Sequence, residues 1–321
     1  MRRHLPWLLA VILTACMFLY VWFKVDLSAL GNLSLGLAAA LFALTILFTV
    51  VYTVGAGLLL RGMGGPASLF SVYLVITGAG AAGLVSDPKL GIPLRVFFYR
   101  AILGVPVAVG SGAVILETLI WFILMGFILM APVPQFWTTE ISWIPPLSVL
   151  FISAAFIAGL ILWPKLATPL TRYTSRPIVN RIVNFFSEIR TAVGRVDKRQ
   201  FLMAVLLLAS TYVLDAFSLH LLLDAMGARQ PLFELVYIIV FSYLVGLATL
   251  LPLGLGPRDV TFVYLLTLLG VPLDVAASAA LVQRVLRNVI PLGLGLISMA
   301  VLGFNRLKPP SGSEPETPTP C

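Results

Sequence analysis

The stretch GVPVAVGSGAVILE at residues 104–117 returns in altered form as GVPLDVAASAALVQ at residues 270–283. Aligned without gaps, the two stretches are identical at five of fourteen positions, and each opens a long apolar segment. The alignment sets Glu117 opposite Gln283, one of the few polar residues in each segment. A membrane chain built from two copies of such a unit is more typical of a transporter than of an enzyme. The alternative is a chance match in a chain rich in Gly, Val and Pro.

Many apolar residues and few charges define the class of this chain. Of its 321 residues, 60% are hydrophobic and only 11% are charged, whereas a soluble domain carries about 25% charged residues. The apolar residues form long runs rather than the alternation of an outer-membrane barrel. We therefore expect an all-α, polytopic membrane protein. The two cysteines, Cys16 and Cys321, are far apart and suggest neither a disulfide framework nor a metal site.

Apolar runs of about 20 residues mark the candidate transmembrane segments. About eight are long enough to span a bilayer, and two, at residues 90–103 and 258–269, are too short to cross alone. Both short runs contain arginine and follow a Gly/Pro-rich break, which lipid tolerates only inside protein or beside a water-filled cavity. We therefore expect half-helices or re-entrant segments there. The long runs cover residues 6–24, 34–60, 68–86, 105–130, 146–163, 201–223, 232–251 and 272–303.

Lysine and arginine in the loops predict the orientation. They place both termini, Arg61 and residues 164–200 in the cytoplasm, whereas loop 131–145 has none and is expected outside. Eight of the 21 Lys and Arg residues fall within 164–200, so the net charge of +8 suits anionic headgroups rather than nucleic acid. When the membrane crossings are counted from these positions, the unit at residues 34–130 starts outside the cell and the unit at residues 201–303 starts in the cytoplasm. The two repeats would therefore be inverted relative to each other.

We expect one membrane domain over residues 1–308, with a cytoplasmic basic linker at 164–200 and a disordered tail at 309–321. The linker fits either an amphipathic helix on the cytoplasmic leaflet or an ordinary basic connection. The N-terminus resembles a lipoprotein signal ending at Cys16, but its apolar run continues to Phe23 and is long enough to span. A transmembrane segment is therefore preferred there.

Charged and polar residues at membrane depth are costly and usually face a cavity or a partner. Here they gather near the two short segments, where arginine forks and half-helix N-termini could hold a phosphorylated lipid headgroup. The structural alternative is that the arginines snorkel to the interface or pair with the acids to hold the bundle together. The candidate substrate-binding residues are Arg95, Arg100, Glu117, Arg258, Asp259, Gln283, Arg284 and Arg287.

Glycine and proline shape the breaks next to these residues. Asp215 lies on the apolar run at 201–223 with Thr211 and Ser218 on the same side. It either relays a proton or belongs to a polar seam between helices, and the seam is favoured. The candidate broken-helix residues are Gly91, Gly104, Pro106, Pro252, Gly254, Gly256, Gly270 and Pro272.

Enzyme signatures do not emerge from the sequence. His220 and Asp224 form no convincing acyltransferase pair, and no Walker loop marks ATP as the energy source. We therefore expect no catalytic residues, no metal and no cofactor. Any uphill transport would need an ion gradient.

Two segments carry a resemblance to a known family. Residues 251–295 read LPLGLGPRDVTFVYLLTLLGVPLDVAASAALVQRVLRNVIPLGLG, and residues 90–121 read LGIPLRVFFYRAILGVPVAVGSGAVILETLIW. Both resemble motifs of the lysylphosphatidylglycerol synthase transmembrane family, UPF0104-type integral membrane proteins with a flippase-like domain. The matching positions are Leu90, Gly91, Arg95, Gly104, Pro106 and Glu117 in the earlier segment, and Pro252, Gly254, Leu255, Gly256, Arg258, Asp259, Leu269, Gly270, Val271, Pro272, Arg284 and Pro291 in the later one.

The chain departs from the family pattern at a few positions. Leu253 replaces a usual Gly, Asp259 replaces Glu, and Thr118 stands where the family often has Arg. These departures bear on the substrate more than on the fold. The resemblance implies a membrane domain that translocates lipids such as aminoacylated phosphatidylglycerol, or that handles polyprenyl or hopanoid lipids in some branches.

Bifunctional members of that family carry a soluble aminoacyltransferase domain after the membrane part. This chain ends at Cys321, shortly beyond its last apolar run, so we expect it to lack that domain and not to act as an enzyme. We expect a translocase of a phosphate-containing lipid in the bacterial inner membrane, with both termini cytoplasmic and membrane lipids as its partners. The alternative is a non-transporting membrane subunit that binds a lipid-modifying or glycosyl-transferring enzyme and presents substrate to it.

Overall fold

The computed structural model describes most of the chain between residues 34 and 303. The span expected at 6–24, the lipoprotein-like segment ending at Cys16, the tail at 309–321 and the break residues Pro252 and Gly254 lie outside the described residues. Within the described residues all regular secondary structure is helical, which confirms the all-α class. The described residues are 34–65, 68–85, 91–131, 133, 147–155, 157–159, 162–163, 177–249 and 256–303.

Along the sequence, the helices fall into two groups, one before and one after the basic linker. The first half is α3 (Leu35–Gly62), α4 (Leu69–Val85), α5 (Gly91–Leu103) and α6 (Val107–Met130). The second half is α9 (Lys198–Ala225), α10 (Leu232–Ala248), α11 (Pro257–Leu268), α12 (Leu273–Arg284), the π-turn η5 (Val285–Val289) and α13 (Ile290–Leu302). Helix α8 (Pro177–Val193) lies between the two halves in the sequence.

Four helices of the described part are long and apolar enough to cross a membrane. They are α3, α6, α9 and the continuous helix from Leu273 to Leu302. Helices α5 and α11 have 13 and 12 residues and are therefore only about 20 Å long, less than the roughly 30 Å of a bilayer core. The remaining apolar helices are shorter than a full span and include Leu69–Gly83 and Leu232–Ala248. The protein is thus a multi-pass membrane protein.

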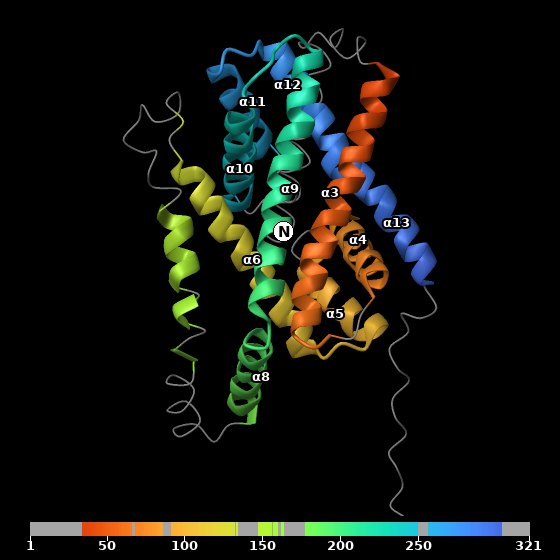
Figure 1. Ribbon diagram of the computed structural model, residues 1–321, viewed down its shortest axis with the longest axis vertical. Coiled ribbons are helices and arrows are strands. Elements are labelled where there is room, and N and C mark those ends of the chain that lie inside the picture. Colours follow the sequence, from red (N-terminus) through yellow and green to blue (C-terminus); the bar gives the residue numbers. More distant parts are fainter. Residues whose placement is uncertain are drawn as a thin grey trace, which may run out of the picture.

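The two halves follow the same helix plan. Helices α3 and α9 both have 28 residues, and α4 and α10 both have 17 residues. The start of α9 follows the start of α3 by the same number of residues as the start of α10 follows that of α4. In the same way, the number of residues from the start of α5 to the start of α11 equals the number from the start of α6 to the start of α12. Consecutive helices pack against each other in the same order in each half. In Figure 1, α3 runs from top to bottom and α9 from bottom to top.

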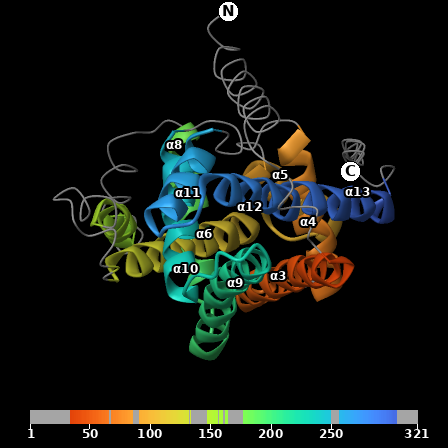
Figure 2. The ribbon, with the colours of Figure 1, turned by 90° about the horizontal axis from the view of Figure 1, so that it is seen from above.

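Each half builds most of one large apolar core, and two smaller cores combine α6 of the first half with α9 and α10 of the second. The first core is built from α3 to α6, with Leu60, Val75 and Val114 buried, and the second from α9 to α12, with Leu219 and Ile238 buried. Helix α3 packs along α9, and α4 packs along α13 (Figures 1 and 2). Side chains of both halves therefore meet along α3, α4 and α6.

The two Gly-Val-Pro corners have nearly the same geometry. Gly104 and Gly270 have φ of 66° and 82°, a left-handed conformation that glycine adopts without strain. The prolines that follow, Pro106 and Pro272, are the N-caps of α6 and α12, each with φ of −55°. Glycine thus ends each short helix, and proline starts the next long one.

The basic linker contains a helix rather than an irregular connection. Helix α8 buries Val183, Ile189 and Ala192 on one side and exposes Arg181 and Arg190 on the other. Its buried side packs against α6. Of the two interpretations of this segment, the amphipathic helix therefore holds for residues 177–193. Its position on the cytoplasmic leaflet stays a prediction.

A π-turn interrupts the last long helix. The N–H of Ile290 bonds to the carbonyl of Val285, five residues back. Pro291 lacks the N–H that an α-helix would give to the carbonyl of Arg287, and a wider turn accommodates that loss. A π-turn changes the direction in which the following side chains point, so Arg284 and Arg287 can contact different partners.

Glycine allows the close approach of α13 to α4. A Cβ at Gly295 would lie 2.4 Å from the carbonyl oxygen of Thr77 and 2.4 Å from the Cβ of Ala81. We predict that Gly295→Ala lowers the free energy of unfolding by about 1–3 kcal/mol, the usual cost of overpacking. The measurement is thermal unfolding of the purified protein in detergent. Gly293→Ala is the control, because a Cβ there meets no atom within 4 Å. Equal melting temperatures for the two variants would contradict this packing.

Candidate functional site

The first polar cluster joins α5 to α6 inside the first half. Arg95 donates from Nη1 and Nη2 to the two carboxylate oxygens of Glu117, at 2.9 and 2.6 Å. Its Nε donates to the hydroxyl of Tyr99 at 2.9 Å, and Nη1 also reaches the hydroxyl of Tyr52 at 3.0 Å. Tyr52 in turn donates to Glu117. The side chains of the ion pair are only 9% and 6% exposed, so this network is closed and neutral.

Helical phase explains which arginine of α5 joins the cluster. Tyr99 follows Arg95 by one turn and therefore lies on the same face. Arg100 is five positions from Arg95, on a different face, and it is exposed. The structure does not bring Arg100 to either polar cluster.

The second polar cluster lies in the second half and begins at the start of α11. Asp259 accepts a hydrogen bond from the backbone N–H of Gly256 at 3.3 Å, so it caps this short helix. Arg284, the last residue of α12, donates from Nε to Asp259 at 3.0 Å, and its Nη2 forms a second contact with the same carboxylate. This pair holds the broken helix α11 against α12.

A further ion pair joins the π-turn to α9. Arg287 donates from Nε to Asp215 at 2.7 Å, and its Nη2 lies 2.6 Å from the same oxygen. The guanidinium carbon of Arg287 also stacks 3.9 Å from the ring centre of Phe48 on α3. The other oxygen of Asp215 accepts a hydrogen bond of 3.4 Å from Tyr243. Asp215 therefore belongs to a polar seam between helices.

Arg258 has a different kind of partner. Its guanidinium carbon lies 4.0 Å from the ring centre of Tyr243, a cation–π contact. Among the described residues no carboxylate pairs with it. The cluster thus holds three arginines against two aspartates, which leaves one net positive charge. The other expected polar residue, Gln283, donates to Ser218 at 3.3 Å.

One buried donor in this cluster has no acceptor. The Arg287 side chain is 6% exposed, and among the described residues its Nη1 has no hydrogen-bond partner. An unpaired buried charged donor is costly, so this atom marks a place where an acceptor of another molecule would be stabilised.

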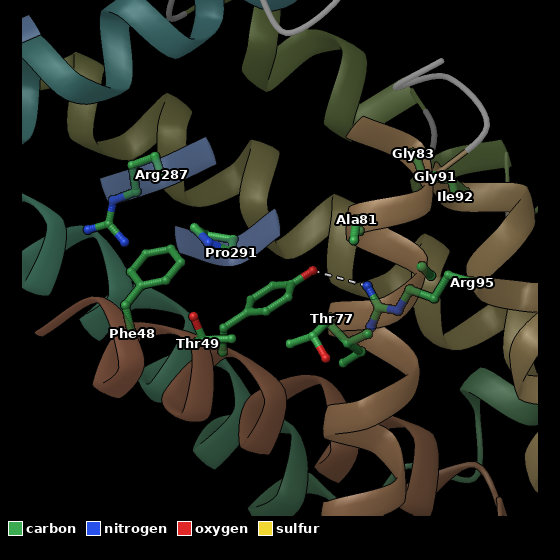
Figure 3. A pocket seen from close by; sticks show the side chains of 14 residues that line it. Phe48, Thr49, Thr77, Ala81, Gly83, Gly91, Ile92, Arg95, Arg287 and Pro291 are labelled. Atoms are coloured by element: carbon green, nitrogen blue, oxygen red, sulfur yellow. Dashed lines mark hydrogen bonds between the residues drawn. The ribbon is translucent and has the colours of Figure 1, made fainter. Parts of the chain in front are cut away.

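Arg287 lines a cavity of about 400 Å³ between α3, α4, the start of α5 and the π-turn. Figure 3 shows Arg287 and Phe48 at one side of this cavity and Arg95 at the other; Pro291 and Thr49 also line it. Most of the lining is apolar or small. The cavity therefore has a guanidinium on each of two sides and an otherwise hydrocarbon-compatible wall. The small and apolar lining residues are Ile76, Ala79, Gly80, Ala81, Gly83, Gly91 and Ile92.

The second half has only a small crevice of about 10 Å³ near its own charges. Asp215, Arg258 and Arg284 line it, together with Ser242 and Gln283. Its volume is close to that of one water molecule. The larger space near these clusters is therefore the cavity, which α3, α4 and α5 of the first half and Arg287 and Pro291 of the second half line.

Several residues of the two clusters were not candidates from the sequence. Tyr99 has a simple signal, because it is one helical turn from Arg95. Tyr52 follows Thr45 and Thr49 in a series of polar residues with helical spacing on apolar α3. Gly80 and Tyr243 carry no such signal, since their role depends on how helices pack.

In the part of the chain that the structure describes, no group of three or more His, Cys, Asp or Glu residues could hold a metal ion. The acidic side chains of both clusters instead face arginines.

Comparisons with known proteins give consistent matches. A family model described as the lysylphosphatidylglycerol synthase TM region matches residues 7–295. The chain is similar to a UPF0104 membrane protein of Methanothermobacter thermautotrophicus, with 24% identity over 249 residues that cover 70% of this chain and 69% of the relative. It is also similar to a UPF0104 membrane protein of Methanocaldococcus jannaschii, with 20% identity over 280 residues that cover 81% and 83% of the two chains. No solved structure gives a significant match.

The closed network around Arg95 predicts a large effect of a small change. Glu117→Gln keeps the side-chain shape but leaves Arg95 buried without its counter-charge, so we expect a loss of about 3–5 kcal/mol in unfolding free energy. The control is Asp224→Asn in the exposed pair Asp224–Arg229, whose side chains are 52% and 74% exposed. That change should cost less than about 1 kcal/mol. Thermal unfolding in detergent measures both, and similar losses would show that burial of the Arg95 pair is not important.

Proposed function

The chain belongs to the lysylphosphatidylglycerol synthase transmembrane family, and on this premise we propose that it moves a phosphate-containing lipid across the cytoplasmic membrane. The family membership supports a role connected with membrane lipids. We add that this role is transport and that the recognised chemical group is a phosphate.

The main support for the proposal is the spare, buried donor of Arg287, a residue that lines the cavity. Its Nε and Nη2 are used by Asp215, while Nη1 has no acceptor among the described residues. A phosphate oxygen is a strong acceptor for a guanidinium N–H. The net positive charge of the surrounding cluster also favours an anion over a neutral headgroup.

The walls of the cavity suit the other end of such a lipid. Ile76, Ala81 and Ile92 present apolar surface, and glycines leave space between them. A lipid with its phosphate at Arg287 would find hydrocarbon-compatible surface directly beside it. Aminoacyl-phosphatidylglycerol, polyprenyl phosphates and phosphate-bearing hopanoid derivatives share this chemistry.

We further propose that the two halves are inverted repeats within a bundle of about eight membrane-spanning helices. The equal helix lengths, the matching offsets of the helix starts and the opposite directions of α3 and α9 support this (Figure 1). Transporters with inverted repeats carry their substrate near the interface of the repeats. The cavity, lined by α3, α4 and α5 of one half and the π-turn of the other, has this location.

The test is lipid movement in proteoliposomes with a cavity-filling variant. Gly80 lines the cavity, and a Cβ there meets no atom within 4 Å, so Gly80→Phe should fold and fill the space. With fluorescent phosphatidylglycerol and dithionite access as the readout, we expect the wild-type protein to move lipid faster than empty liposomes. Gly80→Phe should slow this movement at least about tenfold, equivalent to roughly 1.4 kcal/mol on the barrier.

Gly293→Phe is the control for that substitution. It adds the same ring on exposed α13, where a Cβ also meets nothing within 4 Å, but it does not line the cavity. Its rate should equal that of the wild-type protein. Unchanged movement in folded Gly80→Phe would exclude the cavity as the route. Absence of movement by the wild-type protein across anionic, isoprenoid and hopanoid lipids would favour the non-transporting subunit instead.

A further inference from the structure

We propose that the second half carries a second phosphate-binding site, formed by Arg258 and occupied in this structure by the ring of Tyr243. This inference deepens the proposed function, on which it rests, because it adds a second position for the same phosphate group.

The cavity and the crevice lie at equivalent positions of the two halves. Counted from the first residue of each helix, Tyr52 of α3 corresponds to Asp215 of α9; Tyr52 lines the cavity and Asp215 lines the crevice. The same count pairs two further lining residues of α4 with residues of α10, and one of α5 with a residue of α11. These are Ile76 with Ile239, Ala79 with Ser242, and Ile92 with Arg258.

One residue pair explains why the crevice is so much smaller than the cavity. Gly80 lines the cavity and has no side chain to fill it. Its equivalent on α10, by the same count from the helix start, is Tyr243. The ring of Tyr243 lies over Arg258, and its hydroxyl reaches Asp215. The volume that is empty beside Gly80 is therefore taken up by a tyrosine side chain in the second half.

Tyr243 covers the arginine that has no carboxylate partner. The face of an aromatic ring attracts a guanidinium, but it supplies none of the oxygen acceptors that phosphate offers to the fork of an arginine. Rotation of Tyr243 away from Arg258 would expose a charge with five N–H donors and no ion pair among the described residues. A phosphate is the ligand that this vacated site would bind most favourably.

Asp215 connects the two sites. It pairs with Arg287, which lines the cavity, and accepts from Tyr243, which covers Arg258. A phosphate that displaces Asp215 from Arg287 would leave this carboxylate free to move within the same seam. The side chains of Arg287, Asp215, Tyr243 and Arg258 therefore form a continuous chain of contacts between the two sites.

The experiment counts bound lipid rather than transport. Native mass spectrometry of the detergent-solubilised protein with dioctanoyl-phosphatidylglycerol should give one retained lipid for the wild-type protein. Tyr243→Ala should retain two, because it uncovers Arg258. Tyr243→Ala combined with Arg258→Gln should return to one. sn-Glycerol 3-phosphate, which has the phosphate but no acyl chains, serves as the second probe and shows whether phosphate alone is sufficient for the added site.

Three controls keep the result interpretable. Tyr243→Phe keeps the ring over Arg258 and should still retain one lipid. Tyr264→Ala removes an exposed tyrosine of α11 and should change nothing. If Tyr243→Ala does not fold, Tyr243→Leu fills part of the volume without offering a ring face to Arg258, and it should also retain two.

A folded Tyr243→Ala or Tyr243→Leu protein that still retains one lipid would overturn the inference. So would a second lipid that persists after Arg258→Gln. Because the readout is stoichiometry, failure here with normal lipid movement would leave the proposed transport standing. A second site without any lipid movement would instead remove the transport proposal.

Discussion

A charge inside a membrane must find a partner, and three buried arginine–carboxylate pairs meet this constraint in the part of the chain that the structure describes. Arg95 with Glu117 ties α5 to α6, Arg284 with Asp259 ties α11 to α12, and Arg287 with Asp215 ties the π-turn to α9. The short helices α5 and α11 cannot span a bilayer by themselves, so these pairs fix them against helices that are longer or continue into a longer one. The packing of the short helices and the burial of these charged side chains both depend on this pairing.

The same pairing determines where a ligand can bind. Arg95 uses its donors on Glu117 and two tyrosines, whereas the buried Nη1 of Arg287 has no partner among the described residues. The π-turn gives Arg287 a different partner from Arg284 although they are one helical turn apart. Beside it, Gly80 leaves a space that Tyr243 fills in the other half. A neutral cluster, a cationic cluster and one open cavity thus follow from a few substitutions within a shared helix plan.

The sequence predicts the all-helical class, the short segments at 90–103 and 258–269 and the two Gly-Val-Pro corners, because apolar run length and Gly/Pro chemistry are local properties. It also places most of the charged residues near each other. It does not predict that Arg100 is exposed, since helical phase relative to neighbours depends on packing. The partners Tyr52 and Tyr243 come from other helices, and the π-turn arises from a proline whose effect on phase is seen only in three dimensions.

The most direct test of the central claim is an experimental structure of the protein in nanodiscs that contain phosphatidylglycerol. We expect density for a phosphate within hydrogen-bond distance of Arg287 Nη1, with hydrocarbon against Gly80 and Ile92. Density for phosphate only at the exposed Arg100, with Arg287 Nη1 bonded to a protein atom and the cavity without lipid, would contradict it.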